Sequence, residues 1–256
     1  MTNKEIMQIA MNQSAIDFGC EAGDFKKTEN KVVISNVNPN ARKYLKLPHY
    51  CGMTSYGTNV VASVNAEIVD EVKAYIEKYP LEHCFETPNL YALNNILLKR
   101  NMQICFMSEY SLPDVSILTA LPCNYALKVL IAEDFKDLYV PEWSNALCED
   151  RKHLDVLGVG AYNDKNELIG FAGCSADCDM MWQIGIDVLP KYRHQGIAAA
   201  LTSRLAIEIL NRGKVPFYCC AWSNMGSIRN AIKSGFRPAW AEMAAKSIEF
   251  VANMNK

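Results

Sequence analysis

The segment Val188-Leu-Pro-Lys-Tyr-Arg-His-Gln-Gly-Ile-Ala198 most constrains the fold, because it passes directly from a strand into a helix. Residues 180–189 have the composition of a strand, and an apolar residue then recurs every four positions from Ile197 to Ile209. The start of a helix leaves backbone N–H groups unpaired, and the helix dipole adds positive potential there. A turn of this kind is suited to binding a pyrophosphate.

Gly196 and Arg193 give this turn further features that favour phosphate binding. Gly196 has no side chain to block the close approach of a ligand, and Arg193, together with Lys191, adds positive charge. The pattern differs from the glycine fingerprint of dinucleotide-binding folds, and it lacks the Gly-Lys-Ser/Thr ending of a P-loop. Taken alone, it does not exclude a plain strand-to-helix turn that contains a glycine.

A second motif begins 28 residues after Gly196, where a strand over 215–222 ends and a short helix over 226–234 follows. Together the two motifs resemble the GNAT family of acyltransferases. The family pattern is R/Q-x-x-G-x-G/A at a helix start, then an asparagine after the next strand and a helix ending in Gly-Phe. In this chain, the pattern is supplied in order by Arg193, Gly196, Ala198, Asn224, Ser227, Gly235 and Phe236.

The resemblance covers about residues 125–240 and predicts an α/β fold. From residue 125 the chain reads as a strand, helical segments, antiparallel strands and then strand-helix-strand-helix, which indicates a mixed sheet with one parallel crossover. We expect the GNAT acyl-CoA-binding fold over 124–256 and an additional α/β domain over 1–123. The N-terminal domain carries no motif with a chemical role, and its sequence permits either a domain that covers the acceptor site or a degenerate GNAT-like copy.

The resemblance implies roles for the residues around both motifs. The strand before the phosphate turn would splay from its parallel neighbour, and acyl-CoA would lie in the gap. Backbone groups of Ile186 and Val188 would pair with the pantetheine arm, and an amide at a bulge would polarise the thioester carbonyl. Asn224 would bind the pantetheine and Ser227 would flank it, although Asn224 equally suits a simple helix cap. The pyrophosphate would be held by backbone N–H groups of His194, Gln195, Gly196, Ile197 and Ala198.

The catalytic groups are harder to assign. Acyl transfer to an amine requires a deprotonated amine, a polarised carbonyl and a proton for the leaving thiolate. GNAT proteins often place a carboxylate on the strand before the turn, but the corresponding position here falls near Trp182 or Gln183. Asp187 is the one acid within that strand and the one catalytic candidate, with a structural aspartate as the alternative. The tyrosine that many members place four residues before the Gly-Phe is Ala231 here.

We therefore expect an N-acetyltransferase that transfers an acetyl group from acetyl-CoA to the primary amine of a small molecule. Glu142 and Trp143, in the usual acceptor-binding region of the family, are candidate contacts for that amine. Two alternatives remain open at this point. One is acetylation of a protein or peptide amine, and the other is a catalytically silent acyl-CoA-binding sensor.

Composition excludes several other classes. The net charge is −2, from 26 Lys and Arg against 28 Asp and Glu, so we expect neither nucleic acid nor a membrane as a partner. No spacing of Cys and His completes a metal site, and we expect no metal. Most of the ten cysteines read as small buried side chains in a reducing cytosol, so we expect a cytoplasmic protein. The sequence allows a homodimer and does not decide the oligomeric state.

Overall fold

The computed structural model describes residues 1–256, which divide into two compact units. Unit 1 comprises Met1–Ile9 and Ser111–Pro238, and unit 2 comprises Ala10–Tyr110 and Ala239–Lys256. Each unit is therefore assembled from two separate stretches of the chain.

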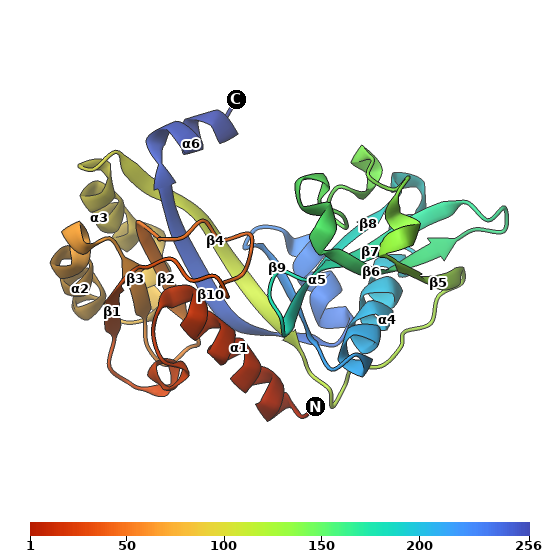
Figure 1. Cartoon of the computed structure of the whole chain (residues 1–256), viewed down its shortest axis with the longest axis horizontal. Helices are drawn as coiled ribbons and strands as arrows, with labels where there is room; N and C mark the ends of the chain where they lie inside the picture. The colour runs from red at the N-terminus through yellow and green to blue at the C-terminus, as the bar shows by residue number, and fades with distance from the viewer. The chain divides into compact units, whose positions relative to one another are not determined.

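The chain passes from one unit to the other within three long elements, which Figure 1 labels. These are helix α1 (Asn3–Phe18) and strands β4 (Met102–Pro113) and β10 (Phe236–Ser247). A single boundary at 123/124 is expected from the sequence, in the stretch after β4 that contains Pro122. The crossings lie inside regular helix and strand, and of the three only the one in β10 falls beside a proline, Pro238.

Unit 1 is built on five strands in the order β9-β8-β7-β6-β5. Strands β5 to β8 are antiparallel neighbours, whereas β8 and β9 are parallel. This confirms the predicted mixed sheet with one parallel crossover. The strands are β5 (Ala126–Ile131), β6 (Asp155–Tyr162), β7 (Leu168–Ser175), β8 (Met181–Val188) and β9 (Val215–Ala221). The helices are η4 (Ala132–Phe135), η5 (Pro141–Trp143), η6 (Glu149–Leu154), η7 (Pro190–Tyr192), α4 (Ile197–Asn211) and α5 (Met225–Lys233).

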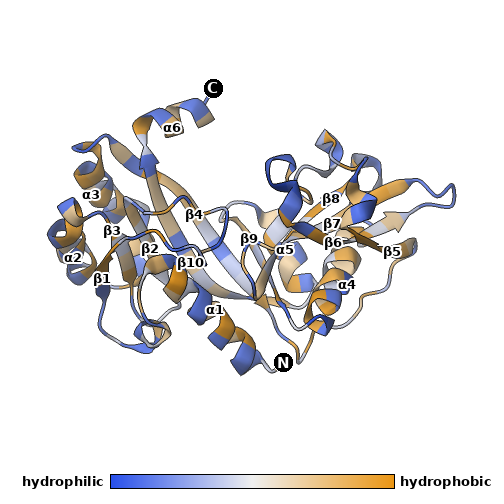
Figure 2. Cartoon of the chain, viewed as in Figure 1, coloured by the Kyte–Doolittle hydropathy of each residue, from blue (hydrophilic) through white to orange (hydrophobic).

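Helix α4 covers one face of this sheet because its apolar stripe faces β6 to β9. Its buried residues include Ile197, Leu201, Leu205 and Ile209, the positions that the four-residue repeat predicted. In Figure 2 the strands of unit 1 are coloured mainly as hydrophobic, and the turn between β6 and β7 as hydrophilic. The pairing of β7 with β8 is regular from Gly170↔Val188 to Ser175↔Gln183. The pairing of β8 with β7 therefore contains no bulge, and the expectation of a bulge is wrong for this pair of strands.

Unit 2 has its own five-stranded sheet, in the order β1-β3-β2-β10-β4. Strands β1 and β3 are parallel, and β2 is antiparallel to both β3 and β10. Besides β4 and β10, its strands are β1 (Lys31–Ile34), β2 (Cys51–Ser55) and β3 (Val61–Val64). Its helices, besides most of α1, are η1 (Ala22–Lys26), η2 (Ala66–Ile68), α2 (Val69–Lys78), η3 (Glu82–Phe85), α3 (Thr87–Leu98) and α6 (Ile248–Met254).

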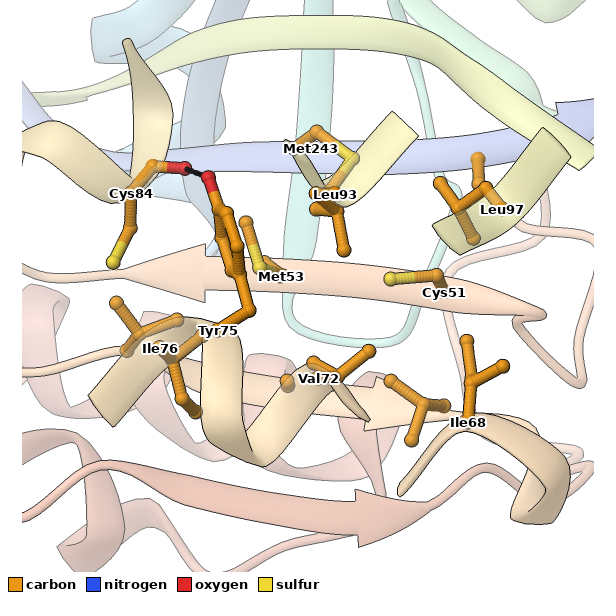
Figure 3. Close-up of a cluster of buried hydrophobic side chains, with 14 of the residues drawn as sticks. Cys51, Met53, Ile68, Val72, Tyr75, Ile76, Cys84, Leu93, Leu97 and Met243 are labelled. Carbon is orange, nitrogen blue, oxygen red and sulfur yellow. Dashed lines mark hydrogen bonds between the residues drawn. The ribbon is translucent and has the colours of Figure 1, made fainter. Parts of the chain in front are cut away.

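One face of the unit 2 sheet is an apolar core under α2 and α3. Figure 3 shows Met53 and Met243 of the sheet packed against side chains of both helices. The one polar side-chain tip in this view is satisfied, since the Tyr75 hydroxyl donates a hydrogen bond of 3.0 Å to the carbonyl of Cys84. Tyr75 therefore brings no unpaired hydroxyl into this core.

Elsewhere unit 2 buries a charged cluster around Arg42, which is only 1% exposed. Its guanidinium donates hydrogen bonds to Asp17 of α1 and, at 2.6 Å, to Glu242 of β10. Trp240 donates its indole N–H to the same Glu242 carboxylate at 2.7 Å. The guanidinium also lies 5.4 Å from the centroid of the Tyr110 ring. One buried cation thus joins the first helix of the chain to its final strand.

Candidate functional site

Strands β8 and β9 are paired only over their first residues. Their parallel partners are Met181↔Val215, Trp182↔Pro216 and Gln183↔Phe217, although β8 continues to Val188 and β9 to Ala221. Beyond these three pairs the two strands no longer pair with each other and a gap opens between them. The predicted splay is therefore confirmed, and an extended ligand can add to the strand edge through backbone hydrogen bonds.

A cavity of about 640 Å³, here called cavity A, lies along this gap and the start of α4. Its lining includes every residue predicted to bind the cofactor except Gln195. The side-chain oxygen of Gln195 instead accepts a hydrogen bond of 2.8 Å from the Tyr125 hydroxyl. The predicted residues that line cavity A are Ile186, Val188, Arg193, His194, Gly196, Ile197, Ala198, Asn224 and Ser227.

The turn into α4 presents backbone amides to cavity A. Gly196 caps the helix in the left-handed region at φ 83°, which favours glycine. Its carbonyl accepts the N–H of Ala200 at 3.1 Å. The N–H groups of residues 197–199 precede that first helical bond and have no partner within the helix. The Nε of Arg193 donates to the Val188 carbonyl at 3.0 Å, so the arginine is held at the rim of the cavity.

Two further cations line cavity A from α5. Arg229 and Lys233 are four residues apart, so they lie on one face of that helix, and neither forms an ion pair. With Arg193 they give the cavity three positive side chains, which suits an anionic ligand. Sequence reasoning missed both residues, although their four-residue spacing on the predicted helix was the available signal.

Asp187 holds a loop over β8. Its carboxylate accepts hydrogen bonds from the Asn145 backbone N–H at 2.9 Å, the Asn145 side-chain amide at 2.6 Å and the Ala146 N–H at 3.0 Å. Directly beneath, a Cβ atom placed on Gly185 would lie 1.8 Å from the Asn145 carbonyl oxygen. These contacts match the structural alternative given for Asp187. The loop over 144–148 is thereby fixed against the open part of β8.

A second cavity of about 380 Å³, here called cavity B, lies beside this loop. Glu142 and Trp143 do not line it. Trp143 is buried against Phe171 with ring centroids 6.4 Å apart, and Glu142 is exposed to solvent. Their role as acceptor contacts stays a prediction, and the loop that follows them, residues 144–148, is the part of this region that lines cavity B. Cavity B is lined by Ser144, Asn145, Ala146, Leu147, Cys148, Arg151, Asp155, Ser175, Gln183, Ile184, Gly185, Ile186, Tyr218, Cys219, Cys220, Asn224 and Ser227.

Asp155 is the one carboxylate in the lining of cavity B, and it is 2% exposed. It accepts hydrogen bonds from the Cys148 N–H at 3.0 Å and the Tyr139 hydroxyl at 3.2 Å. Burial raises the pKa of Asp155 above its ordinary value, although these hydrogen bonds oppose the shift. Ser175, its partner across β6 and β7, has a buried hydroxyl without a hydrogen-bond partner. No sequence motif marked either residue.

Cavities A and B meet, because five residues line both of them. Asn224 is one of these, and its side-chain oxygen accepts the Ser227 N–H at 3.1 Å. The helix-cap alternative for Asn224 is thus confirmed, and the same residue still borders both cavities. The five shared residues are Asn145, Ile186, Tyr218, Asn224 and Ser227.

Two other features of the structure bear on the expectations from sequence. No group of three or more His, Cys, Asp and Glu side chains is placed to hold a metal ion. None of the helices combines the length and the apolar character needed to cross a bilayer.

The chain is similar to known acetyltransferases in sequence pattern and in structure. A family model described as GNAT acetyltransferase matches residues 2–240. No curated protein sequence matches the chain. Similar solved structures include a GCN5-related N-acetyltransferase-like protein from Streptococcus suis 89/1591, with 20% identity and a TM-score of 0.46, covering 62% of this chain and 69% of that one.

Two other solved structures are similar over a comparable part of the chain. A GCN5-related N-acetyltransferase from Kribbella flavida is 15% identical with a TM-score of 0.46, covering 60% of this chain and 63% of that one. A phosphinothricin acetyltransferase from Sinorhizobium meliloti, in complex with AcCoA, is 18% identical with a TM-score of 0.37, covering 49% of this chain and 89% of that one.

The family match extends over nearly the whole chain and includes the phosphate turn, the splayed strands and the asparagine-capped helix. The chain belongs to the GNAT acetyltransferase family, whose general activity is acetyl-CoA-dependent acyl transfer.

Proposed function

We propose that this protein is an N-acetyltransferase that transfers an acetyl group from acetyl-CoA to the primary amine of a small molecule. The observation that carries the proposal is the meeting of two unlike cavities at the gap between β8 and β9. One has an anion-binding turn and basic side chains, and the other is a small polar cavity. Acyl transfer needs such a junction, where donor and acceptor meet in fixed orientation.

Cavity A suits acetyl-CoA, which supplies an activated acyl thioester. The N–H groups at the start of α4, with Arg193, Arg229 and Lys233, would hold the phosphates. The unpaired edge of β8 would take the pantetheine arm as an added strand. A backbone N–H on this edge would then polarise the thioester carbonyl as negative charge develops on its oxygen.

Cavity B suits the acceptor. Its volume of about 380 Å³ fits a small molecule, which favours a small amine over a protein or peptide chain. Asp155 offers a carboxylate to an ammonium group, and the unpaired Ser175 hydroxyl offers a further hydrogen bond. The acceptor would therefore be a polar amine that enters beside the 144–148 loop.

The first experiment is thermal unfolding with acetyl-CoA, longer acyl-CoA esters, CoA, NAD and ATP, followed by thiol release with a panel of small amines. A ligand that binds only the folded protein, at 100 times its dissociation constant, stabilises it by about 2.7 kcal/mol. We expect stabilisation by CoA esters alone and thiol release that depends on an amine. Stabilisation without release by any amine would favour the silent sensor, and no stabilisation by any CoA ester would refute the proposal.

Reversing the charge at Arg229 tests the phosphate side. We expect Arg229→Glu to weaken acetyl-CoA binding by about 10- to 100-fold, because a charge-assisted hydrogen bond contributes about 1.5–3 kcal/mol. Isothermal titration with acetyl-CoA measures the change. Lys165→Glu is the matched control, since it makes the same charge change at an exposed turn of the same unit. Equal affinities for the two variants would remove Arg229 from the site.

The acid side of the pH profile tests Asp155. A carboxylate binds an ammonium group only when it is ionised, and burial raises the pKa of Asp155. We therefore expect KM for the amine to rise as pH falls through this raised pKa, at a higher pH than an ordinary aspartate would give. Asp155→Asn should abolish this dependence and raise KM at neutral pH. Asp164→Asn, in the exposed turn between β6 and β7, should leave the profile as it is.

A further inference from the structure

The proposed reaction leaves a question about protons. When the amine nitrogen bonds to the carbonyl carbon, the carbon–sulfur bond breaks and the electron pair stays on sulfur. The thiolate then needs a proton. Many members of the family have a tyrosine on this helix as the proton donor. The corresponding residue here is Ala231 of α5, whose methyl group cannot donate a proton.

The five residues that line both cavities are the groups nearest to where donor and acceptor meet. Ile186 has no exchangeable side-chain proton. Asn145 and Asn224 carry amides, which do not titrate. The Asn145 amide donates a hydrogen bond to Asp187, and the Asn224 amide oxygen accepts one from the α5 backbone. A serine hydroxyl such as that of Ser227 is a much weaker acid than a phenol. Tyr218 is the remaining candidate.

Tyr218 is held with its hydroxyl at the α5 side of the junction. It comes from the part of β9 beyond the three pairs with β8 and is 4% exposed, and its ring packs beside Phe236 with centroids 6.2 Å apart. Ser227 and Asn230 lie close enough to its hydroxyl for hydrogen bonding to lower the pKa of Tyr218, against the effect of burial. Asn230 is itself fixed, since its side-chain amide donates to the Thr202 hydroxyl at 3.0 Å.

The spacing of small residues on α5 explains how the Tyr218 side chain from β9 reaches the junction of the two cavities. Ser227, Asn230 and Ala231 are separated by three and four positions and share one helix face. Ala231 and Tyr218 belong to the same buried cluster. A large side chain at 231 would compete for that space, whereas alanine leaves the helix face to the phenol from β9.

We propose that Tyr218 is the general acid that protonates the departing CoA thiolate. The proposal rests on the acetyltransferase function proposed above. The phenol gives its proton to sulfur, and the resulting phenolate regains a proton from the acceptor nitrogen, which must lose one to become an amide. Ser227 and Asn230 stabilise the phenolate while it lasts. A neutral amine loses one proton and sulfur gains one, so this step balances, and an acceptor that binds as an ammonium ion first gives one further proton to solvent.

The surroundings keep the phenol protonated at neutral pH. Burial raises the pKa of Tyr218, the hydrogen bonds from Ser227 and Asn230 lower it, and the neighbouring thiols of Cys219 and Cys220 raise it. The net direction is upward from its ordinary value, so the donor form is present through the physiological range. On the alkaline side of the profile, kcat should fall when the phenol ionises.

The test begins with Tyr218→Phe, which removes the proton and keeps the ring. We expect kcat to fall by about 100-fold or more, as for loss of a general acid, with an equal fall in kcat/KM. The stabilisation by acetyl-CoA should persist. Tyr162→Phe, on β6 away from both cavities, is the matched control and should keep full activity.

A fluorinated tyrosine at position 218 separates catalysis from structure. Its phenol is more acidic, so the alkaline limb of the rate profile should move to lower pH, whereas a merely structural phenol would leave the limb in place. An unmoved limb, or wild-type kcat in Tyr218→Phe, would overturn the role of Tyr218 alone. Failure of the wild-type protein to release thiol with any amine would instead overturn the acetyltransferase function, and this role with it.

Discussion

Arg42→Ala is expected to lower the free energy of unfolding by about 3–5 kcal/mol, the range for removing one partner of a buried ion pair. The substitution leaves Asp17 and Glu242 with negative charge in a buried place and no cation between them. It also removes the guanidinium from the aromatic rings of Tyr110 and Trp240. The two carboxylates hold the pKa of Arg42 well above its ordinary value against the cost of burial, so the charge is present at every accessible pH.

Guanidinium chloride unfolding of the full chain measures this loss. Arg100→Ala is the matched control, because Arg100 pairs with Glu71 at 2.7 Å in a partly exposed place. Its effect should stay below about 1 kcal/mol. A second comparison replaces Arg42, Asp17 and Glu242 together by apolar residues, which should recover much of the stability. Equal effects of Arg42→Ala and Arg100→Ala would contradict the assignment of the cluster as a buried charge network.

Gly185→Ala is expected to reduce activity by about 100-fold, because a misplacement of about 1 Å in a positioned site can cost that much. The added Cβ would lie 1.8 Å from the Asn145 carbonyl oxygen and 2.8 Å from its carbon, and both are backbone atoms that cannot rotate away. The 144–148 loop must therefore lift from β8 and strain its bonds to Asp187. We also expect a loss of about 1–3 kcal/mol in stability from the overpacking.

Steady-state kinetics with the amine found by screening, together with thermal unfolding, measure both effects. Gly23→Ala is the control, since a Cβ atom there meets nothing within 4 Å. If Gly185→Ala retained wild-type rate and stability, the 144–148 loop would not lie against β8 as described. The shape of cavity B, which this loop lines, would then also be incorrect.

The phosphate side of the site could be predicted from sequence because its parts are contiguous. Arg193, Gly196 and the first residues of α4 act largely through backbone groups, and a strand that turns into a helix places such groups without help from distant residues. The second motif follows at a fixed spacing, so Asn224 and Ser227 could be predicted as well.

The acceptor side could not be predicted in the same way. Cavity B is formed where the 144–148 loop folds over β8 and meets the start of β6 and the end of β9, segments with no shared periodicity. Asp155 looks like any strand-initiating aspartate, and Tyr218 like any core aromatic residue. Glu142 and Trp143 were chosen by region rather than by contact, and a shift of a few residues decides which side chains face the cavity.

The unit boundaries show a similar limit. Pro113 at the end of β4 and Pro122 beyond it favoured a boundary over 111–124, and no feature of the sequence predicted that β10 is shared between two units. The chain nevertheless leaves unit 1 after Pro238 and finishes in unit 2. A strand long enough to serve two cores gives a continuous pattern and no composition change at the point of transfer.

The late return of β10 to unit 2 has a consequence for synthesis on the ribosome. Residues 239–247 form the strand that lies between β2 and β4 in the sheet of unit 2, so β4 has no link to β2 in this sheet until they are made. Residues 10–110 of unit 2 therefore cannot complete their sheet until residues 111–238 of unit 1 have been translated. Unit 1 therefore has the opportunity to fold before unit 2, although most of it is encoded later in the chain.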